Sequence, residues 1–483
     1  MALSRIEPGY PFSTYYVEAD VLPEREESFV QKFIELIYGK TQGRQFCEET
    51  GLGEAGGEFD AFVGKFDQTR LGKAVPVQEE DLERRKIDEL LRKFIGNAAG
   101  GMAKRIVAYL HGYRVVRPLF EDNEIEEIMV NGTKQPILIH HRKHGICKTN
   151  LSFESQREVR AFINQFMDPT DSPYEDIKLP DGSRANVLFP PAAEETIITI
   201  RKFRRQPYSI IDLVAMKTLS SELAAFLWTA VDGMMLFPMN IVFVGGTASG
   251  KTTMLNAAAS FIPPQERIIT IEDTREINLS GREDLLSLET NPKVTLNDLL
   301  RNAIRMRPDR LIVGEVRGEE AQTMLTAMNV GHRGTMGTFH ANNDRDAITR
   351  MESAPMSVPR AMIPLLDLIV VQHRVYSRGK GLVRRVTQVS EVSRTEDVVA
   401  LNEIYRWDPV DDELKRTDLA SQLREKLAKA VGVDAREVSA EIDKRKEIID
   451  YLLQKGITKQ VDVNAFLTEW YGDLAAKKNA KQE

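Results

Sequence analysis

The sequence predicts an α/β protein, in which a parallel-sheet domain follows a smaller α+β domain and a helical N-terminal module. Short apolar runs alternate with helical stretches from Ile210 to Trp407, as expected of a parallel sheet covered by helices. Strand-like runs separated by turns dominate residues 121–203. Apolar residues at helical spacing dominate residues 79–111. A chain of 483 residues is also too long for a single core.

The first region, residues 1–115, is expected to form the helical N-terminal module. Residues 24–38 have a helical pattern, and the apolar side chains between Ile87 and Phe94 recur at i, i+3, i+4 and i+7. Gly96 and the glycines at 100 and 101 divide the longer helical stretch into two helices.

The second region, residues 116–205, is predicted to be the α+β domain. Its strand-like runs are short, and turn residues separate them. These runs are Ile125–Gly132, Pro136–His140, Asn186–Phe189 and Thr196–Ile200. Arg204–Pro207 is predicted to link this domain to the next one.

The third region, residues 206–408, contains the strongest motif of the chain. Gly245–Thr252 reads G-G-T-A-S-G-K-T and matches the phosphate-binding loop G-x-x-x-x-G-K-[ST] at every fixed position. An apolar strand precedes the loop and a good helix former follows it, so backbone N–H groups and a helix N-terminus can point at phosphate oxygens. We expect a bound nucleoside triphosphate, with contacts from Gly245, Thr247, Ala248, Ser249, Gly250, Lys251, Thr252 and Thr253.

Two carboxylates are candidates for the chemistry of phosphoryl transfer. Glu272 and Glu315 each follow a predicted strand, and ligands bind at the carboxyl ends of parallel strands. Gly314 stands where many P-loop ATPases carry a Mg²⁺-binding aspartate. We therefore assign Glu315 as the base or water-orienting residue, and expect Thr252 to hold Mg²⁺ with help from Glu272 through water. Which of the two carboxylates is the general base stays open.

Histidines and arginines near these motifs are further candidates. His332 and His340 flank one predicted strand, and either could sense the γ-phosphate or make a contact across a subunit boundary, unless it is structural. Arg184 and Arg201 lie on or beside strands of the middle domain just before the linker. They could place a positive charge on the γ-phosphate, with surface salt bridging as the alternative. The sheet domain itself supplies Arg275, Arg305, Arg307 and Arg317.

The end of the chain is predicted to contain a hairpin and then helices. Residues 367–376 and 382–392 form the two strands of the hairpin, which closes the sheet. Residues 409–483 form a charged helical C-terminal region, in which Thr417 and Asp418 are predicted to cap the first helix.

Composition limits the classes of function. The hydrophobic fraction is 42%, the charged fraction 28% and the formal net charge −7, which gives no overall basic signature of nucleic-acid binding. Cys47 and Cys147 cannot build a four-cysteine zinc site. No run of about 20 apolar residues could span a bilayer, and the N-terminus has no apolar signal core. We expect a cytoplasmic protein that reaches a membrane only through a partner.

Four motifs together resemble a known family, the secretion ATPase superfamily. They occur in the order of its Walker A, Asp-box, Walker B and His-box motifs, and the segments 179–184 and 198–203 resemble its middle domain. The resemblance covers about residues 121–392. Three features resemble the archaeal-type branch of this superfamily, which is related to the archaellum motor ATPase. The chain lacks a four-cysteine zinc module, and it carries Pro263-Pro264 and the Asp-box sequence of that branch. The four motifs are Gly245–Thr252, Ile271–Glu276, Ile312–Arg317 and Gly331–Asn342.

The resemblance implies a RecA-like P-loop domain after a PAS-like α+β domain, and a homo-hexamer with nucleotide at subunit boundaries. Arg184 and Arg201 would then act as arginine fingers. The implied function is ATP hydrolysis with Mg²⁺ that powers a type IV pilus-like filament or type II secretion. The partner would be a polytopic platform protein at the inner face of the cell membrane. The alternatives are an archaellum rotation motor, a RecA-like nucleic-acid translocase, although no nucleic-acid partner is expected, and a nucleotide sensor without hydrolysis. The motifs leave open the machine, the direction of force, and the roles of residues 1–115 and 409–483.

Overall fold

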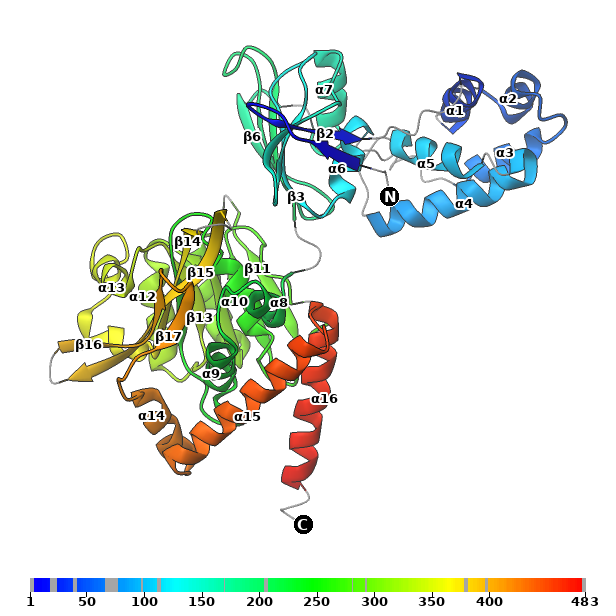
Figure 1. The fold of residues 1–483 in the computed structure, drawn as a ribbon. Helices are drawn as coiled ribbons and strands as arrows, with labels where there is room; N and C mark the ends of the chain where they lie inside the picture. The colour runs from blue at the N-terminus through cyan, green and yellow to red at the C-terminus, as the bar shows by residue number, and fades with distance from the viewer. Residues whose placement is uncertain are drawn as a thin grey trace. The chain divides into compact units, whose positions relative to one another are not determined.

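The computed structural model describes residues 4–17, 24–37, 41–65, 77–96, 99–110, 114–168, 170–203, 207–279, 281–291, 293–377, 381–395 and 398–479. The chain divides into two compact units, Met1–Arg204 and Arg205–Glu483 (Figure 1). The predicted linker 204–207 coincides with this division, although residues 204–206 lie outside the described part of the chain.

Five helices of the first unit share one hydrophobic core, in which several phenylalanine rings pack together. Phe46 packs its ring 5.6 Å from that of Phe33 and 5.1 Å from that of Phe59, and Cys47 is buried in the same cluster. The helices predicted from residues 24–38 and 79–111 are present. The helices are α1 (Glu24–Ile37), α2 (Gly43–Thr50), α3 (Gly56–Val63), α4 (Val77–Ile95) and α5 (Ala99–Leu110).

An eight-stranded sheet forms the other core of the first unit. Its strand order is β1-β2-β5-β4-β3-β8-β7-β6, and helix α7 (Gln156–Ile163) contributes Val159 and Phe162 to its core. The short helix α6 (Arg117–Glu121) precedes β3. The strands are β1 (Ser4–Glu7), β2 (Ser13–Val17), β3 (Ile125–Val130), β4 (Leu138–His141), β5 (Gly145–Thr149), β6 (Tyr174–Lys178), β7 (Arg184–Leu188) and β8 (Ile197–Arg201).

The hairpin β1–β2 differs from the predicted helical start of the chain. β2 pairs in parallel with β5, with Ser13 opposite Cys147, and Tyr15 is buried in the core of the eight-stranded sheet. The Tyr15 hydroxyl also donates a hydrogen bond of 2.5 Å to Asp122. The predicted module 1–115 therefore contributes two strands to the α+β domain. Strands of four and five residues are too short to show a period, and the strand that ties this hairpin to the sheet, β5, is distant in the sequence.

A nine-stranded sheet forms the centre of the second unit, in the order β11-β10-β12-β13-β9-β14-β15-β16-β17. The first six strands in this order run parallel, and the last three are antiparallel, which confirms the predicted α/β class and the closing hairpin. The strands are β9 (Ile241–Val244), β10 (Ile268–Glu272), β11 (Leu285–Glu289), β12 (Arg310–Val316), β13 (Met336–Phe339), β14 (Leu368–Ser377), β15 (Gly381–Thr395), β16 (Val398–Asp408) and β17 (Glu413–Arg416).

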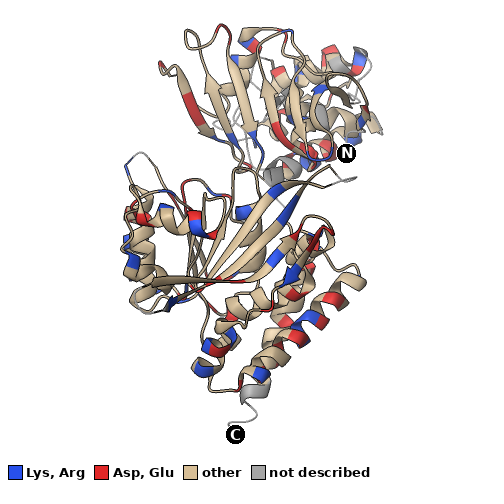
Figure 2. Ribbon diagram, turned by 60° about the vertical axis from the view of Figure 1, so that its left-hand side comes forward, with Lys and Arg blue, Asp and Glu red and all other residues tan. Residues whose placement is uncertain are grey.

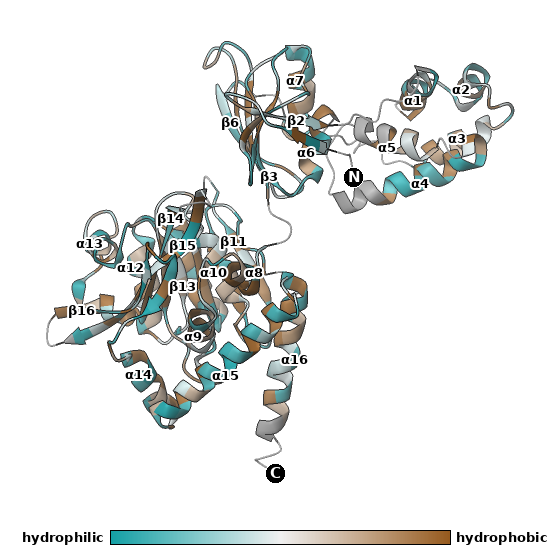
Figure 3. Cartoon of the chain, in the orientation of Figure 1, coloured by the Kyte–Doolittle hydropathy of each residue, from teal (hydrophilic) through white to brown (hydrophobic). Residues whose placement is uncertain are grey.

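Helices cover both faces of this sheet, so its central strands are apolar throughout. Ile241 and Phe243 face one core, which α8, α9 and α10 share, while Val242 and Val244 face the other, which α11, α12 and α13 share. Hydrophobic residues gather between the sheet and its helices (Figure 3). The helices are α8 (Ile210–Ala215), α9 (Ser221–Asp232), α10 (Lys251–Ala259), α11 (Leu296–Ala303), α12 (Glu320–Asn329) and α13 (Asp344–Glu352), with 3₁₀ turns at Gly233–Met235, Ile304–Met306 and Arg360–Leu365.

The C-terminal segment is part of this same unit. Asp408 of β16 pairs with Glu413 of β17, so the predicted boundary between 408 and 409 falls inside the sheet. Three helices follow, α14 (Gln422–Val431), α15 (Ala435–Gln454) and α16 (Gln460–Asn479), and their apolar side chains join the core of α9. Acidic and basic residues are mixed along α15 (Figure 2).

Candidate nucleotide site

The phosphate loop joins β9 to α10 at the carboxyl end of the parallel strands, as predicted. Two of its glycines are required by close packing against β14. A Cβ on Gly245 would lie 2.1 Å from the backbone oxygen of Gln372, and one on Gly250 would lie 2.9 Å from the side-chain nitrogen of Gln372. Gly250 also has φ +98° and Ala248 has φ +58°. The loop is therefore folded tightly onto the neighbouring strand.

Two buried side chains of the loop, Lys251 and Ser249, are suited to bind an anion. The Lys251 ammonium donates to the carbonyl of Gly246 at 3.1 Å and lies 3.5 Å from Nδ1 of His340. Burial lowers the pKa of Lys251, although the charge of Glu315 opposes that shift. Ser249 Oγ is buried and has no hydrogen-bond partner among the described residues. A buried cation, an unpaired hydroxyl and a helix N-terminus fit the phosphates of a nucleotide.

Glu315 lies beside Lys251 in a network of charged groups. Arg317 donates two hydrogen bonds to it, of 2.8 and 2.7 Å, and Nε2 of His340 lies 2.7 Å from Oε1. Burial raises the pKa of Glu315, but the hydrogen bonds from Arg317 and the positive charges nearby outweigh burial and hold the pKa below its usual value. Glu315 is therefore ionised at neutral pH.

His340 connects Glu315 to Lys251. Burial and the charge of Lys251 lower the pKa of His340, so the neutral imidazole dominates at neutral pH. A neutral ring with its proton on Nε2 donates to Glu315 and can accept from Lys251 through Nδ1. The predicted pairing of His340 with the site thus agrees with the geometry.

Glu272 ends β10 and is 3% exposed. Its Oε1 accepts hydrogen bonds of 2.9 Å from the backbone N–H groups of Glu276 and Ile277. Burial nevertheless raises the pKa of Glu272 to about 7. A Cβ on Gly314, in the adjacent strand β12, would lie 2.8 Å from Cγ of Glu272. Glycine stands in the place of an aspartate because Glu272 fills the space.

The described residues contain no group of three or more histidine, cysteine or acidic side chains that could hold a metal ion by themselves. Thr252 lies in the first turn of α10, and Glu272 ends β10, which β12 and β13 separate from β9 in the sheet. Two oxygen donors fit Mg²⁺, which takes few protein ligands and completes its shell with water and phosphate oxygens.

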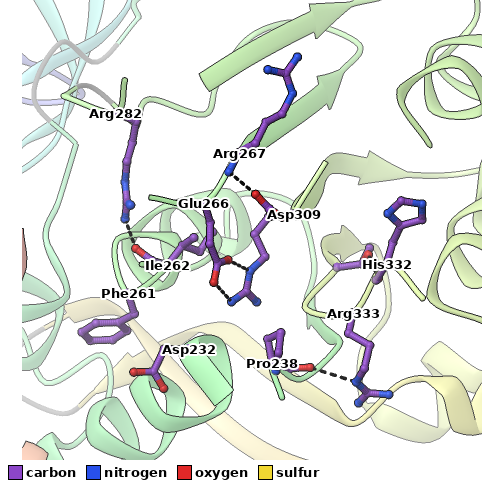
Figure 4. Close-up of polar contacts among 12 residues, drawn as sticks. Asp232, Pro238, Phe261, Ile262, Glu266, Arg267, Arg282, Asp309, His332 and Arg333 are labelled. Carbon is purple, nitrogen blue, oxygen red and sulfur yellow. Dashed lines mark hydrogen bonds and ion pairs between the residues drawn. The ribbon is translucent and has the colours of Figure 1, made fainter. Parts of the chain in front are cut away.

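His332 does not join the site within one subunit. β13 begins after His332 and ends before His340, so the two histidines lie beyond opposite ends of this strand. Figure 4 shows His332 beside Arg333, whose guanidinium bonds to Pro238 O at 3.3 Å and to Asp367 at 2.9 Å. The prediction gave each histidine two roles, sensing of the γ-phosphate or a contact across a subunit boundary, and the two ends of a strand point to opposite ends of the sheet. Only a contact across a subunit boundary remains as a prediction for His332.

Arg184 and Arg201 lie opposite each other on β7 and β8. They belong to the first compact unit, whereas the phosphate loop belongs to the second. Their predicted role as arginine fingers stays a prediction.

Two residues near the loop carried no signal in the sequence. Gln372 lies against Gly245 and Gly250, as described above, and Nε of Arg384 donates to the carbonyl of Ala248 at 3.1 Å. Both belong to the hairpin β14–β15, which was predicted only as the closing element of the sheet. The hairpin contacts the loop because β14 lies beside β9, and local sequence patterns do not predict the order of strands in a sheet.

Among the described residues, no helix combines the length and the apolar character needed to cross a bilayer.

Comparison with known proteins identifies relatives of this chain. Residues 120–463 match the family described as "Type II/IV secretion system protein". The uncharacterised protein MJ0900 of Methanocaldococcus jannaschii is 34% identical over 381 residues, which are 75% of this chain and 68% of that protein. The conjugal transfer protein TrbB of Rhizobium radiobacter is 33% identical over 285 residues, covering 56% of this chain and 85% of TrbB.

Among solved structures, the VirB11 ATPase of the Brucella suis type IV secretion system, in complex with sulphate, aligns with 57% of this chain and 95% of its own. The sequence identity is 24% and the TM-score 0.30. The relative from Methanocaldococcus jannaschii agrees with the archaeal-type resemblance of the sequence. The family match covers more than half of the chain, and it includes the phosphate loop, Glu272, Glu315 and His340. The chain therefore belongs to the type II/IV secretion system protein family, within the secretion ATPase superfamily.

Proposed function

We propose that this chain hydrolyses ATP with Mg²⁺, and that a homo-hexamer of it powers assembly of a type IV pilus-like filament or type II secretion. The observation that carries the proposal is the meeting of Lys251, His340 and Glu315 at the phosphate loop. An ionised carboxylate next to the γ-phosphate lysine is what a hydrolase needs and a nucleotide sensor does not.

The loop residues bind and orient the triphosphate. Backbone N–H groups of residues 246–252 and the Lys251 ammonium hold the β- and γ-phosphates. Thr252 and Glu272 would hold Mg²⁺, which neutralises phosphate charge when bound. Water attacks the γ-phosphorus, the bond to the bridging oxygen breaks, and ADP and inorganic phosphate leave.

We assign Glu315 as the residue that takes the proton of the attacking water. Its low pKa keeps it ionised, and His340 fixes one of its oxygens. Arg317 occupies both oxygens in this arrangement, so it must release one of them before water can bind there. Glu272 is the other candidate for the base: a pKa of about 7 suits a group that accepts a proton at neutral pH, but one of its oxygens is held by backbone N–H groups.

The remaining parts of the proposal follow from the family resemblance. Arg184 and Arg201 would place positive charge on the γ-phosphate, and His332 would contact a neighbouring subunit. The working location would be the cytoplasmic face of the membrane, where a polytopic platform protein receives the force. Rotation of an archaellum would use the same site with a different load.

The first test is steady-state hydrolysis by the full chain with Mg²⁺ and ATP. Glu315→Gln should keep ATP binding and lose at least about 100-fold in kcat, because the amide cannot accept the proton. Glu283→Gln removes an exposed carboxylate elsewhere on the same unit and should leave turnover unchanged. Unchanged turnover in Glu315→Gln would refute the assignment of the base. Turnover that depends on DNA, with binding that falls steeply with salt, would favour the translocase instead.

A further inference from the structure

The hairpin β14–β15 packs against the phosphate loop. A bulge between Val371 and Gln372 brings β14 against the loop, where the glycines leave no room for a Cβ. On the neighbouring strand, Nε of Arg384 donates to the carbonyl of Ala248 at 3.1 Å. The Arg384 Cδ would also lie 3.2 Å from a Cβ on Gly250.

The contact with Arg384 determines the direction of one peptide unit. The peptide between Ala248 and Ser249 is planar, so its carbonyl and its N–H point in opposite directions. Because the carbonyl points outward to Arg384, the N–H of Ser249 points inward, where it lies 3.3 Å from the carbonyl of Gly246. Ala248 has φ +58°, a conformation that a residue with a side chain keeps only when its surroundings hold it. In this structure the Ser249 N–H donates to Gly246, and a bound phosphate oxygen would replace that carbonyl as its acceptor.

The next residue, Arg385, connects the same strand to the end of α8. Its side chain is 3% exposed, and it bonds to the carbonyl of Met216 at 3.2 Å and to that of Arg384 at 2.9 Å. Asp412 holds the other side of its guanidinium at 2.7 and 2.9 Å. Met216 caps α8, the first helix after the segment that joins the two compact units.

We propose that Arg384 is a positioning residue of the nucleotide site, and that Arg384 and Arg385 couple the orientation of the phosphate loop to the end of α8. The proposal rests on the nucleotide binding proposed above. Binding of phosphate fixes the peptide of Ala248 and Ser249, and β15 carries the change to the carbonyl of Met216.

Arg374 provides a matched control for Arg384. It lies directly opposite Arg384 in the hairpin and is exposed like it, so Arg374→Ala removes the same charge from the same place. Arg384→Ala should bind a fluorescent ADP analogue about fivefold more weakly and raise KM for ATP to a similar extent, with kcat changed less than about twofold. Arg384→Lys keeps a charged donor and should recover part of the affinity. Arg374→Ala should bind as the unsubstituted chain does.

Hydrogen exchange measures the coupling separately. In the unsubstituted chain, ADP at saturation should slow exchange in residues 210–219; in Arg384→Ala, saturating ADP should leave these residues unchanged. Equal ADP affinities of Arg384→Ala and Arg374→Ala would overturn the positioning role, and a retained effect on residues 210–219 would overturn the coupling. Neither result would contradict the proposal that the chain hydrolyses ATP. That proposal would be contradicted if Lys251→Ala left ATP turnover unchanged. A chain that binds no ADP would overturn both.

Discussion

Single residues of this site acquire their chemistry from neighbours on other strands. Glu315 and Glu272 are both glutamates at strand ends, yet the pKa of the first is lowered by Arg317 and that of the second is raised by burial. Gly314 is small because Glu272 occupies the space above it. A carboxylate beside cations stays charged and can serve as a base, whereas a buried one exchanges its proton near neutral pH.

The raised pKa of Glu272 predicts a dependence of stability on pH. The folded chain keeps a proton on Glu272 up to about pH 7, whereas the unfolded chain loses it near pH 4.5. The folded state therefore binds more protons in this window, and the free energy of unfolding falls as pH rises from about 5 to 8. Glu272→Gln cannot ionise, so its stability should rise relative to the unsubstituted chain by up to about 3 kcal/mol over this window.

Urea unfolding followed by tryptophan fluorescence measures this difference. All three tryptophans, Trp228, Trp407 and Trp470, belong to the second compact unit, so the signal reports on the unit that contains Glu272. Glu283→Gln, which removes an exposed carboxylate of the same unit, serves as the control. Parallel pH profiles of the unsubstituted chain and Glu272→Gln would contradict the raised pKa.

At the scale of elements, the sequence predicted segments long enough to show a pattern and missed the shortest strands. The strand, loop and helix around Gly245–Thr252 were predictable because the motif and its apolar strand are contiguous. β1, β2 and β17 were missed, since each is four or five residues long and shows no period of its own; β2 also depends on pairing with the distant strand β5. Thr417 and Asp418 were predicted to cap the next helix, but Ser421 accepts from Arg424 N and caps it four residues later.

The same reasoning applies to the site. Glu315 and Lys251 were predictable from motifs, whereas the contact of Arg384 with the loop required knowledge that β14 lies beside β9. The sequence also did not separate the two histidines, which lie beyond opposite ends of β13, so a contact across a subunit boundary stays the prediction for His332.

The C-terminal helices were predicted as a separate region, but a buried ion pair joins α15 to α9. Arg445 and Asp232 are 2% and 0% exposed and are 2.9 Å apart. Arg445→Leu would leave Asp232 charged and buried, so it should lower the free energy of unfolding by about 3–5 kcal/mol. Lys444→Leu, at a neighbouring exposed position of the same helix, should change it by less than about 1 kcal/mol. Urea unfolding followed by circular dichroism compares them, and equal effects would show that the pair does not hold α15.

At the scale of the whole molecule, the chain has separate cores on either side of residues 204 and 205. The cores of the nine-stranded sheet contain only residues from 210 onward, and those of the first unit end at Ile200. Nucleotide binding is expected from the second unit alone, because Lys251, Thr252, Glu272 and Glu315 all belong to it. Hydrolysis is proposed to need both units, because Arg184 and Arg201 belong to the first.

This division predicts that a fragment of residues 207–483 separates binding from turnover. The fragment keeps both cores of the second unit and all three tryptophans, so it should unfold cooperatively in urea. Its affinity for a fluorescent ADP analogue should lie within about threefold of that of the full chain. Its ATP turnover should be at least about 100-fold slower, since a lost arginine finger costs about 10³ or more in kcat.

The full chain with Arg184→Ala and Arg201→Ala together should reproduce the defect of the fragment, because both lack the same two guanidinium groups. Arg157→Ala and Arg160→Ala together, at exposed positions of α7 in the same unit, remove an equal charge and should leave turnover unchanged. Slow turnover by the fragment but normal turnover by the variant with Arg184→Ala and Arg201→Ala would mean that the first unit acts through oligomerisation rather than through these arginines. Light scattering of both proteins with ADP would then show a smaller assembly for the fragment alone.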